Sequence, residues 1–164
     1  MLGDDGTGVN SALVKDLDGA QYVTLLLVCL DPRNRSVQYA GAGHIPCHLV
    51  CPSGEILHVM ESTGPPSGLF AGSTFCTSPA IPLNYGETLV LLTDGVTEAA
   101  NNDEAQFGAG KALEFIKCHP HHSAAELVRG IHETVRAFTG GGPPSDDITS
   151  VICKVSMPAM EASA

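Results

Sequence analysis

Three carboxylates stand beside apolar runs of the sequence and could together bind a divalent cation. Asp94 ends a run over residues 88–93 in which four of the five positions from Leu89 to Thr93 are apolar, and Gly95 follows it at a sharp turn. Burial of such a strand would hold Asp94 rigidly at its rim. This is where a metal ligand or a catalytic acid is expected.

Asp146 and Asp147 directly precede a second strand-like run, over residues 150–155. If the two runs pair as antiparallel neighbours, all three carboxylates lie at the same edge of the sheet. Clustered carboxylates repel one another unless a cation shares them, and hard oxygen ligands select magnesium, manganese or calcium rather than zinc. The pattern therefore predicts a divalent-metal site.

Plainer interpretations of the same residues stay open. An Asp-Gly pair is common wherever a strand ends in a turn, and Asp146 could simply cap the turn after Pro143-Pro144-Ser145. A zinc site is not predicted in the segment from His44 to Cys51, because its histidines and cysteines are followed by no second ligand pair downstream.

The residues before Asp94 predict antiparallel β-structure. Residues 22–30 form a long aliphatic and β-branched run, which predicts a central strand buried on both faces. The turn over 31–35 joins this run to the alternating residues 36–39, as in a hairpin. Further strands are predicted over residues 47–51, 56–59, 74–83 and 88–93.

Helices are predicted after Asp94, over residues 107–118 and 123–139. The second helix begins with the capping box Ser123-Ala124-Ala125-Glu126, and it stops at the glycine and proline run over 140–144. Its apolar positions have helical spacing and must cover a sheet; they include Leu127, Ile131 and Val135.

Both ends of the chain lack such patterns. Residues 1–9 predict a disordered lead, residues 10–16 a short helix, and residues 156–164 a flexible tail. The 164 residues suit one domain with a sizeable core, which we expect over residues 10–155.

The charge balance excludes some partners. Eighteen acidic side chains face eight basic ones, and the formal net charge of −10 repels nucleic acid and anionic membranes. No apolar run is long enough to span a bilayer, and the start does not resemble a signal peptide. The six cysteines lie mostly in apolar stretches, as core residues in a reducing compartment would. We therefore expect a cytoplasmic protein.

Several motifs occur together in a characteristic order. They are Ala42-Gly43-His44-Ile45-Pro46, the loop Gly64-Pro65-Pro66-Ser67-Gly68-Leu69, Leu92-Thr93-Asp94-Gly95-Val96-Thr97-Glu98-Ala99, Phe107-Gly108 and Asp146-Asp147-Ile148-Thr149. In this order and context, residues 10–155 resemble the PPM-type metal-dependent protein serine/threonine phosphatases (protein phosphatase 2C-like), in their bacterial SpoIIE/RsbU-like branch.

The resemblance implies an α+β fold, an antiparallel β-sandwich flanked by helices, with two manganese or magnesium ions at one end. It implies direct hydrolysis of phosphoserine or phosphothreonine on a bacterial signalling protein, such as an anti-sigma-factor antagonist, by water that the metal ions activate. Carried over to this chain, Asp94 and Asp146 are catalytic metal ligands, Asp147 lies at the metal site, and Gly95 lies at the cofactor.

The chain also departs from the family pattern. The family's N-terminal half carries a Gly-Asp-x-x-Gly motif, whose Asp bridges both metals, and a long helix. Gly3-Asp4-Asp5-Gly6 looks similar, but Asp4 stands only 18 positions before Tyr22, which is too few for that helix. We therefore expect a fold that is incomplete at the N-terminus, weak metal binding and impaired activity of the chain alone.

Two further expectations follow from the missing half. Apolar sheet surface left uncovered should favour a homodimer or an exchange of segments between chains. The alternative function is a non-catalytic regulatory or interaction module built on the phosphatase scaffold. A haloacid-dehalogenase-like mechanism is set aside, because its nucleophile would fall on Leu92.

Overall fold

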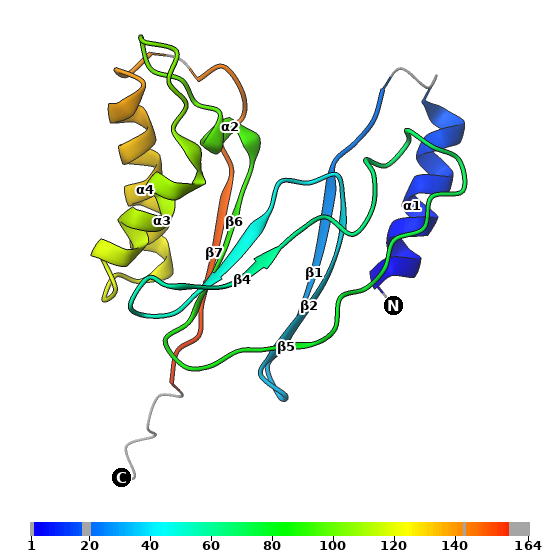
Figure 1. Ribbon diagram of the computed structural model, residues 1–164, viewed down its shortest axis with the longest axis horizontal. Coiled ribbons are helices and arrows are strands. Elements are labelled where there is room, and N and C mark those ends of the chain that lie inside the picture. Colours follow the sequence, from blue (N-terminus) through cyan, green and yellow to red (C-terminus); the bar gives the residue numbers. More distant parts are fainter. Residues whose placement is uncertain (1, 18–20, 143, 158–164) are drawn as a thin grey trace. The chain divides into compact units, whose positions relative to one another are not determined.

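The computed structural model of the chain describes residues 2–17, 21–142 and 144–157. Its elements follow the order α1, β1–β6, α2–α4 and β7 (Figure 1). The predicted α+β class, with antiparallel sheets and flanking helices, is confirmed. Contacts divide the chain into two compact units, residues 1–46 with 59–83, and residues 47–58 with 84–164. A phosphatase domain with boundaries at 10 and 155 stays a prediction.

The first unit holds a three-stranded antiparallel sheet in the order β1-β2-β5, with α1 packed against β1 and β2 (Figure 1). The predicted hairpin is confirmed, since β1 and β2 pair from Leu25↔Ala42 to Asp31↔Ser36. The elements are α1 (Leu2–Asp16), β1 (Leu25–Asp31), β2 (Ser36–Ala42) and β5 (Ile81–Pro82).

The prediction of a disordered lead over residues 1–9 was wrong for residues 2–9, which form most of α1. Tertiary contacts stabilise this glycine-containing helix. Gly3 is buried where a Cβ would collide with the Phe75 carbonyl oxygen, and its N–H donates to Thr77 Oγ1 at 2.8 Å. Asn10 is fully buried; its Oδ1 accepts a hydrogen bond from the N–H of Gly68 at 2.9 Å. Such partners outweigh the low helix propensity of glycine.

Two strand predictions for the first unit were also wrong. The run over residues 22–30 is not a central strand buried on both faces, because β1 lies at the edge of its sheet. Tyr22 is 57% exposed and Leu30 43%. The strand expected over 74–83 is reduced to the two residues of β5, since that segment instead contacts α1 through Phe75 and Thr77.

A four-stranded antiparallel sheet in the order β4-β3-β6-β7 lies in the second unit, except for Val59 and Met60, the last two residues of β4. The α4 helix contacts β7 and α3, so the two long helices lie side by side next to the β6–β7 strands (Figure 1). The elements are β3 (Cys47–Val50), β4 (Ile56–Met60), β6 (Thr88–Leu92), α2 (Asp94–Thr97), α3 (Gly108–Cys118), α4 (Ala124–Phe138) and β7 (Ser150–Lys154).

Helix α4 matches its prediction closely. The hydroxyl of Ser123 accepts a hydrogen bond from the Glu126 N–H, and the Glu126 carboxylate accepts one from the Ser123 N–H, which completes the capping box. Leu127, Ile131 and Val135 are each at most 1% exposed. The helix therefore buries the apolar stripe that the sequence predicted.

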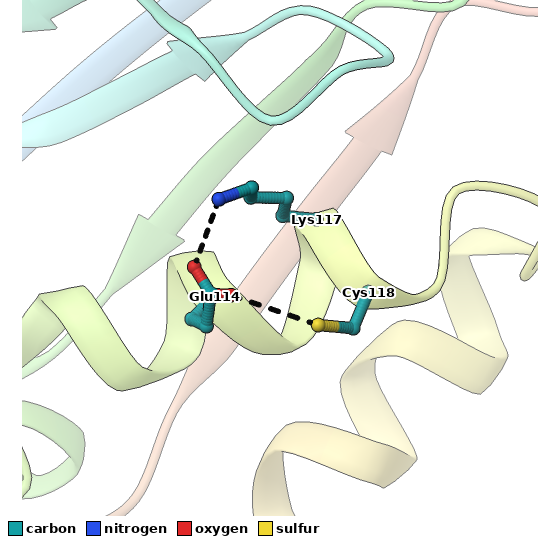
Figure 2. A network of polar contacts seen from close by, with 3 residues as sticks. All are labelled: Glu114, Lys117 and Cys118. Carbon is teal, nitrogen blue, oxygen red and sulfur yellow. Dashed lines mark hydrogen bonds and ion pairs between the residues drawn. The ribbon is translucent and has the colours of Figure 1, made fainter.

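The solvent side of α3 is polar. Lys117 Nζ lies 3.4 Å from Glu114 Oε2, and Cys118 Sγ lies 3.7 Å from Glu114 Oε1 (Figure 2). An exposed ion pair of this kind contributes little to stability. The six cysteines all lie within the described residues and form no disulfide there, but Cys29 and Cys76 are exposed like Cys118, so the prediction that the cysteines fill the core was wrong for these three.

The structure describes only the first two residues of the predicted C-terminal tail, 156–164. Ser156 and Met157 are exposed and lie outside regular structure, and residues 158–164 lie outside the described residues. In the described part of the chain, no helix combines the length and the apolar character needed to cross a membrane.

Candidate functional site

The ends of β6 and β7 form the core of the candidate site. The two strands pair antiparallel from Thr88↔Lys154 to Leu92↔Ser150. The pairing continues one residue further, because the Thr93 N–H donates to the Thr149 carbonyl at 3.0 Å and the Thr149 N–H donates to Thr93 Oγ1 at 3.0 Å. This register places Asp94 beside the segment that carries Asp146 and Asp147.

The backbone approaches closely at this edge. Thr93 Oγ1 also lies 3.1 Å from the Asp147 carbonyl oxygen, to which it donates. Gly95 is buried in the first turn of α2, and a Cβ there would lie 2.8 Å from the carbonyl carbon of Asp147. Only glycine allows the start of α2 to contact residues 146–147 in this way.

The structure thus brings all three predicted carboxylates to one edge of the sheet of the second unit. Asp94 Oδ1 accepts a hydrogen bond from the Gly95 N–H at 3.0 Å, and Asp146 Oδ1 accepts one from the Asp147 N–H at 2.7 Å. All three residues are exposed. Within the described ranges, no lysine or arginine forms an ion pair with them.

These carboxylates fit part of a divalent-metal site. They are hard oxygen donors, exposed and without a cationic partner in the described part of the chain, as ligands of magnesium or manganese would be before the ion binds. They do not form a complete cage. Among the described residues, no three His, Cys, Asp or Glu side chains are gathered closely enough to hold a metal ion.

A pocket of about 510 Å³ adjoins this edge within the second unit. Gly95 and Ser145 line it, and they are the chain neighbours of Asp94 and Asp146. Its other walls come from the last turns of α4, the residues after α2 and the segment before β7; they include His132, Val135, Arg136, Thr139 and Ile148.

The sequence did not point to this pocket. Its basic side chains, His132 and Arg136, lie on α4 next to residues of the apolar stripe, where they resemble ordinary polar positions of an amphipathic helix. The one available signal was that Arg136 precedes the glycine-rich run over 140–142, where the chain must turn toward Asp146. His132 is oriented by Ser150, whose Oγ lies 3.0 Å from its Nε2.

Comparison with known families and curated proteins identifies relatives of this chain. The family model described as "Stage II sporulation protein E (SpoIIE)" matches residues 7–156. Protein IcfG of Synechocystis sp. is 31% identical over 134 residues, which cover 82% of this chain and 21% of that protein. Phosphoserine phosphatase RsbP of Bacillus subtilis is 26% identical over 149 residues, which cover 90% of this chain and 34% of RsbP. The chain thus spans about a fifth to a third of the length of these relatives.

Among solved structures, the SiaA-PP2C domain of Pseudomonas aeruginosa superimposes with a TM-score of 0.74 at 23% identity. The match covers 88% of this chain and 57% of that one. This likeness shows the fold, which is that of PP2C-type phosphatase domains.

Proposed function

Because the chain belongs to the SpoIIE family and has the fold of PP2C-type phosphatase domains, we propose that it takes part in hydrolysing phosphoserine or phosphothreonine. The proposed substrate is a cytoplasmic bacterial signalling protein, such as an anti-sigma-factor antagonist, and the proposed cofactor is Mn²⁺ or Mg²⁺. RsbP, named a phosphoserine phosphatase, supports this choice of substrate class.

The observation that carries the proposal is the pairing of Thr93 with Thr149, which sets Asp94 beside Asp146 and Asp147 at one edge. Divalent ions held there would supply an activated water and offset the negative charge of the phosphate. Asp94 and Asp146 hold the ions in our proposal, and Asp147 lies at the metal site. Gly95 permits the close backbone approach between the two segments that carry these carboxylates.

The reaction needs no covalent enzyme intermediate. The water oxygen forms a bond to phosphorus as the bond between phosphorus and the serine oxygen breaks, the water gives up a proton, and the serine oxygen takes one. Holding the water in line with the leaving serine oxygen is most of such catalysis, so loosely held ions would position the water poorly and slow the reaction.

The isolated chain should bind metal weakly and turn over slowly. The described residues gather fewer than three ligands at one point. Magnesium or manganese held by one or two carboxylates keeps most of its waters and has little affinity. A partner chain, through a homodimer or an exchange of segments, could supply the missing carboxylate.

The lack of a three-ligand cluster among the described residues favours a second candidate function. A scaffold that lacks a three-ligand site could serve as a non-catalytic regulatory or interaction module. Such a module would bind its signalling partner without Mn²⁺-dependent hydrolysis.

Hydrolysis of p-nitrophenyl phosphate by the isolated chain, with and without Mn²⁺, tests the two functions. The test variant is Asp94→Asn, which removes one proposed metal ligand. Its control is Asp103→Asn, which changes an exposed loop carboxylate. We expect slow Mn²⁺-dependent turnover that Asp94→Asn abolishes and Asp103→Asn preserves. Absence of Mn²⁺-dependent turnover in the parent chain would favour the non-catalytic module. Fast turnover abolished by Asp94→Asn would show that the site is complete.

A further inference from the structure

The pocket beside the carboxylate edge has the composition of an anion-binding site. We propose that it binds an acidic side chain of the phosphoprotein substrate, close in sequence to the phosphorylated residue. This inference rests on the proposed function, and it adds a specificity determinant, Arg136, that the phosphatase reaction itself does not require.

The charge of the lining is unusual for this chain. The sequence has 18 acidic and 8 basic side chains, yet the described residues that line the pocket include Arg136 and His132 and no Asp or Glu. The remaining polar side chains of the lining are the hydroxyls of Thr139 and Ser145. Hydroxyls, imidazole and guanidinium can all donate hydrogen bonds to an anion.

Arg136 is available to a ligand. It is exposed, and within the part of the chain that the structure describes its guanidinium forms no ion pair. A guanidinium presents five N–H donors in a planar fork that matches a carboxylate. Arg136 therefore supplies a positive charge that can pair with the carboxylate of an acidic side chain, in a protein whose net charge is negative.

The apolar part of the lining suits the stem of such a side chain. Val135 and Ile148 lie in the wall together with Ala99, Ala100 and Pro144. The volume of about 510 Å³ falls within the usual range of ligand pockets and exceeds what a single inorganic anion fills. The pocket therefore fits a carboxylate carried on a peptide better than a free ion.

The position of the pocket defines which substrate residue enters it. Gly95 and Ser145 belong to the lining and adjoin Asp94 and Asp146 in the chain, one Cα–Cα step of about 3.8 Å away. An extended peptide advances roughly 3.3–3.6 Å per residue. With its phosphate at the carboxylate edge, a substrate would present a residue close to the phosphoserine to the pocket, and the spacing chosen for the test is two residues.

Two synthetic phosphopeptides test this inference with the full chain. They are identical except for Glu or Gln two residues from the phosphoserine, and their binding is measured by fluorescence anisotropy in Mg²⁺. The variant is Arg136→Gln, and the matched control is Arg129→Gln, an exposed arginine of the same helix that does not line this pocket. Thermal unfolding checks that both variants keep the fold.

We expect the parent chain and Arg129→Gln to bind the Glu peptide on the order of tenfold more tightly than the Gln peptide, and Arg136→Gln to bind both equally. No preference in the parent chain, or a preference that survives Arg136→Gln, would overturn the inference. In parallel, ¹⁵N amide shifts of Gly141 and Gly142 should respond to the Glu peptide. An equal response of these amides to inorganic phosphate alone would also overturn it.

The outcome is separable from that of the proposed function. Peptide binding can be measured without turnover. If the parent chain prefers the Glu peptide but shows no Mn²⁺-dependent hydrolysis of p-nitrophenyl phosphate, the phosphatase proposal is contradicted and the pocket assignment stands. Hydrolysis of p-nitrophenyl phosphate without any Glu preference would contradict the pocket assignment alone.

Discussion

A Cβ placed on Gly95 would lie 2.8 Å from the carbonyl carbon of Asp147, closer than real Cβ contacts come. The close packing of these two residues connects the first turn of α2 to the segment before β7. Both carboxylates of the proposed metal site, Asp94 and Asp146, are immediate chain neighbours of this contact.

We therefore predict that Gly95→Ala separates the two segments. The colliding atoms are backbone, which cannot move aside like the end of a side chain, so the cost should be about 1–3 kcal/mol of unfolding free energy. Urea unfolding measures it. Gly110→Ala, in α3 with open space around its Cα, is the control and should be neutral or slightly stabilising. Equal stability of the two variants would show that the Gly95 contact is not tight.

Helix α4 should depend on its buried stripe. Ile131 is fully buried between Leu127 and Val135, so Ile131→Asp would bury an unpaired carboxylate and cost on the order of 3–5 kcal/mol. Thermal unfolding followed by circular dichroism measures the loss. Ala125→Asp, exposed in the first turn of the same helix, should have little effect. An unchanged midpoint for Ile131→Asp would contradict the packing of α4.

The capping box makes α4 sensitive to acid. Hydrogen bonds from the Ser123 N–H and the Ser123 hydroxyl lower the pKa of the Glu126 carboxyl below its ordinary value of 4.5. Because the folded pKa lies below the unfolded one, this contribution to stability is present above pH 4.5 and is lost as the pH falls through the folded pKa. Glu126→Gln removes it.

Unfolding midpoints of the parent chain and Glu126→Gln should therefore differ near pH 6 and converge at lower pH. The pH titration of both proteins by differential scanning calorimetry checks this. A constant difference across the acidic range would mean that Glu126 does not stabilise α4 through its charge.

The edge strand β1 should promote self-association. Tyr22, beside this strand, and Leu30, within it, are 57% and 43% exposed, and an unpaired apolar edge is a template for pairing with a second chain. We expect light scattering to show a dimer that Leu30→Lys weakens. The control is Val9→Lys, which changes an exposed apolar residue of α1, outside any sheet edge. A monodisperse monomer at high concentration would contradict this expectation.

Local signals explain why parts of the second unit could be predicted from the sequence. The continuous apolar run over residues 88–93 and the Ser123–Glu126 box define β6 and α4, because the information lies within each segment. Antiparallel pairing of β6 with β7 then places Asp94 beside Asp146.

The elements that were missed depend on contacts distant in sequence. Helix α1 contains three glycines, and the buried Asn10 secures it by accepting from the Gly68 N–H and donating to the Phe70 carbonyl at 3.2 Å. Leu30 is exposed because β1 lies at the edge of its sheet. The apolar run over residues 22–30 carries no information about the order of the strands. The pocket at Arg136 is built from three separate segments, so no single pattern predicts it.

In the proposed metal site, Asp94 and Asp146 hold the same divalent ions. Calorimetric titration of Mn²⁺ into the parent chain, Asp94→Asn, Asp146→Asn and the double variant tests whether they share them. We predict weak binding that each single substitution reduces at least about tenfold, roughly 1.4 kcal/mol. The second substitution should add little, because the two carboxylates act as a unit. Unchanged Mn²⁺ binding in both single variants, or losses that simply add, would contradict a shared site.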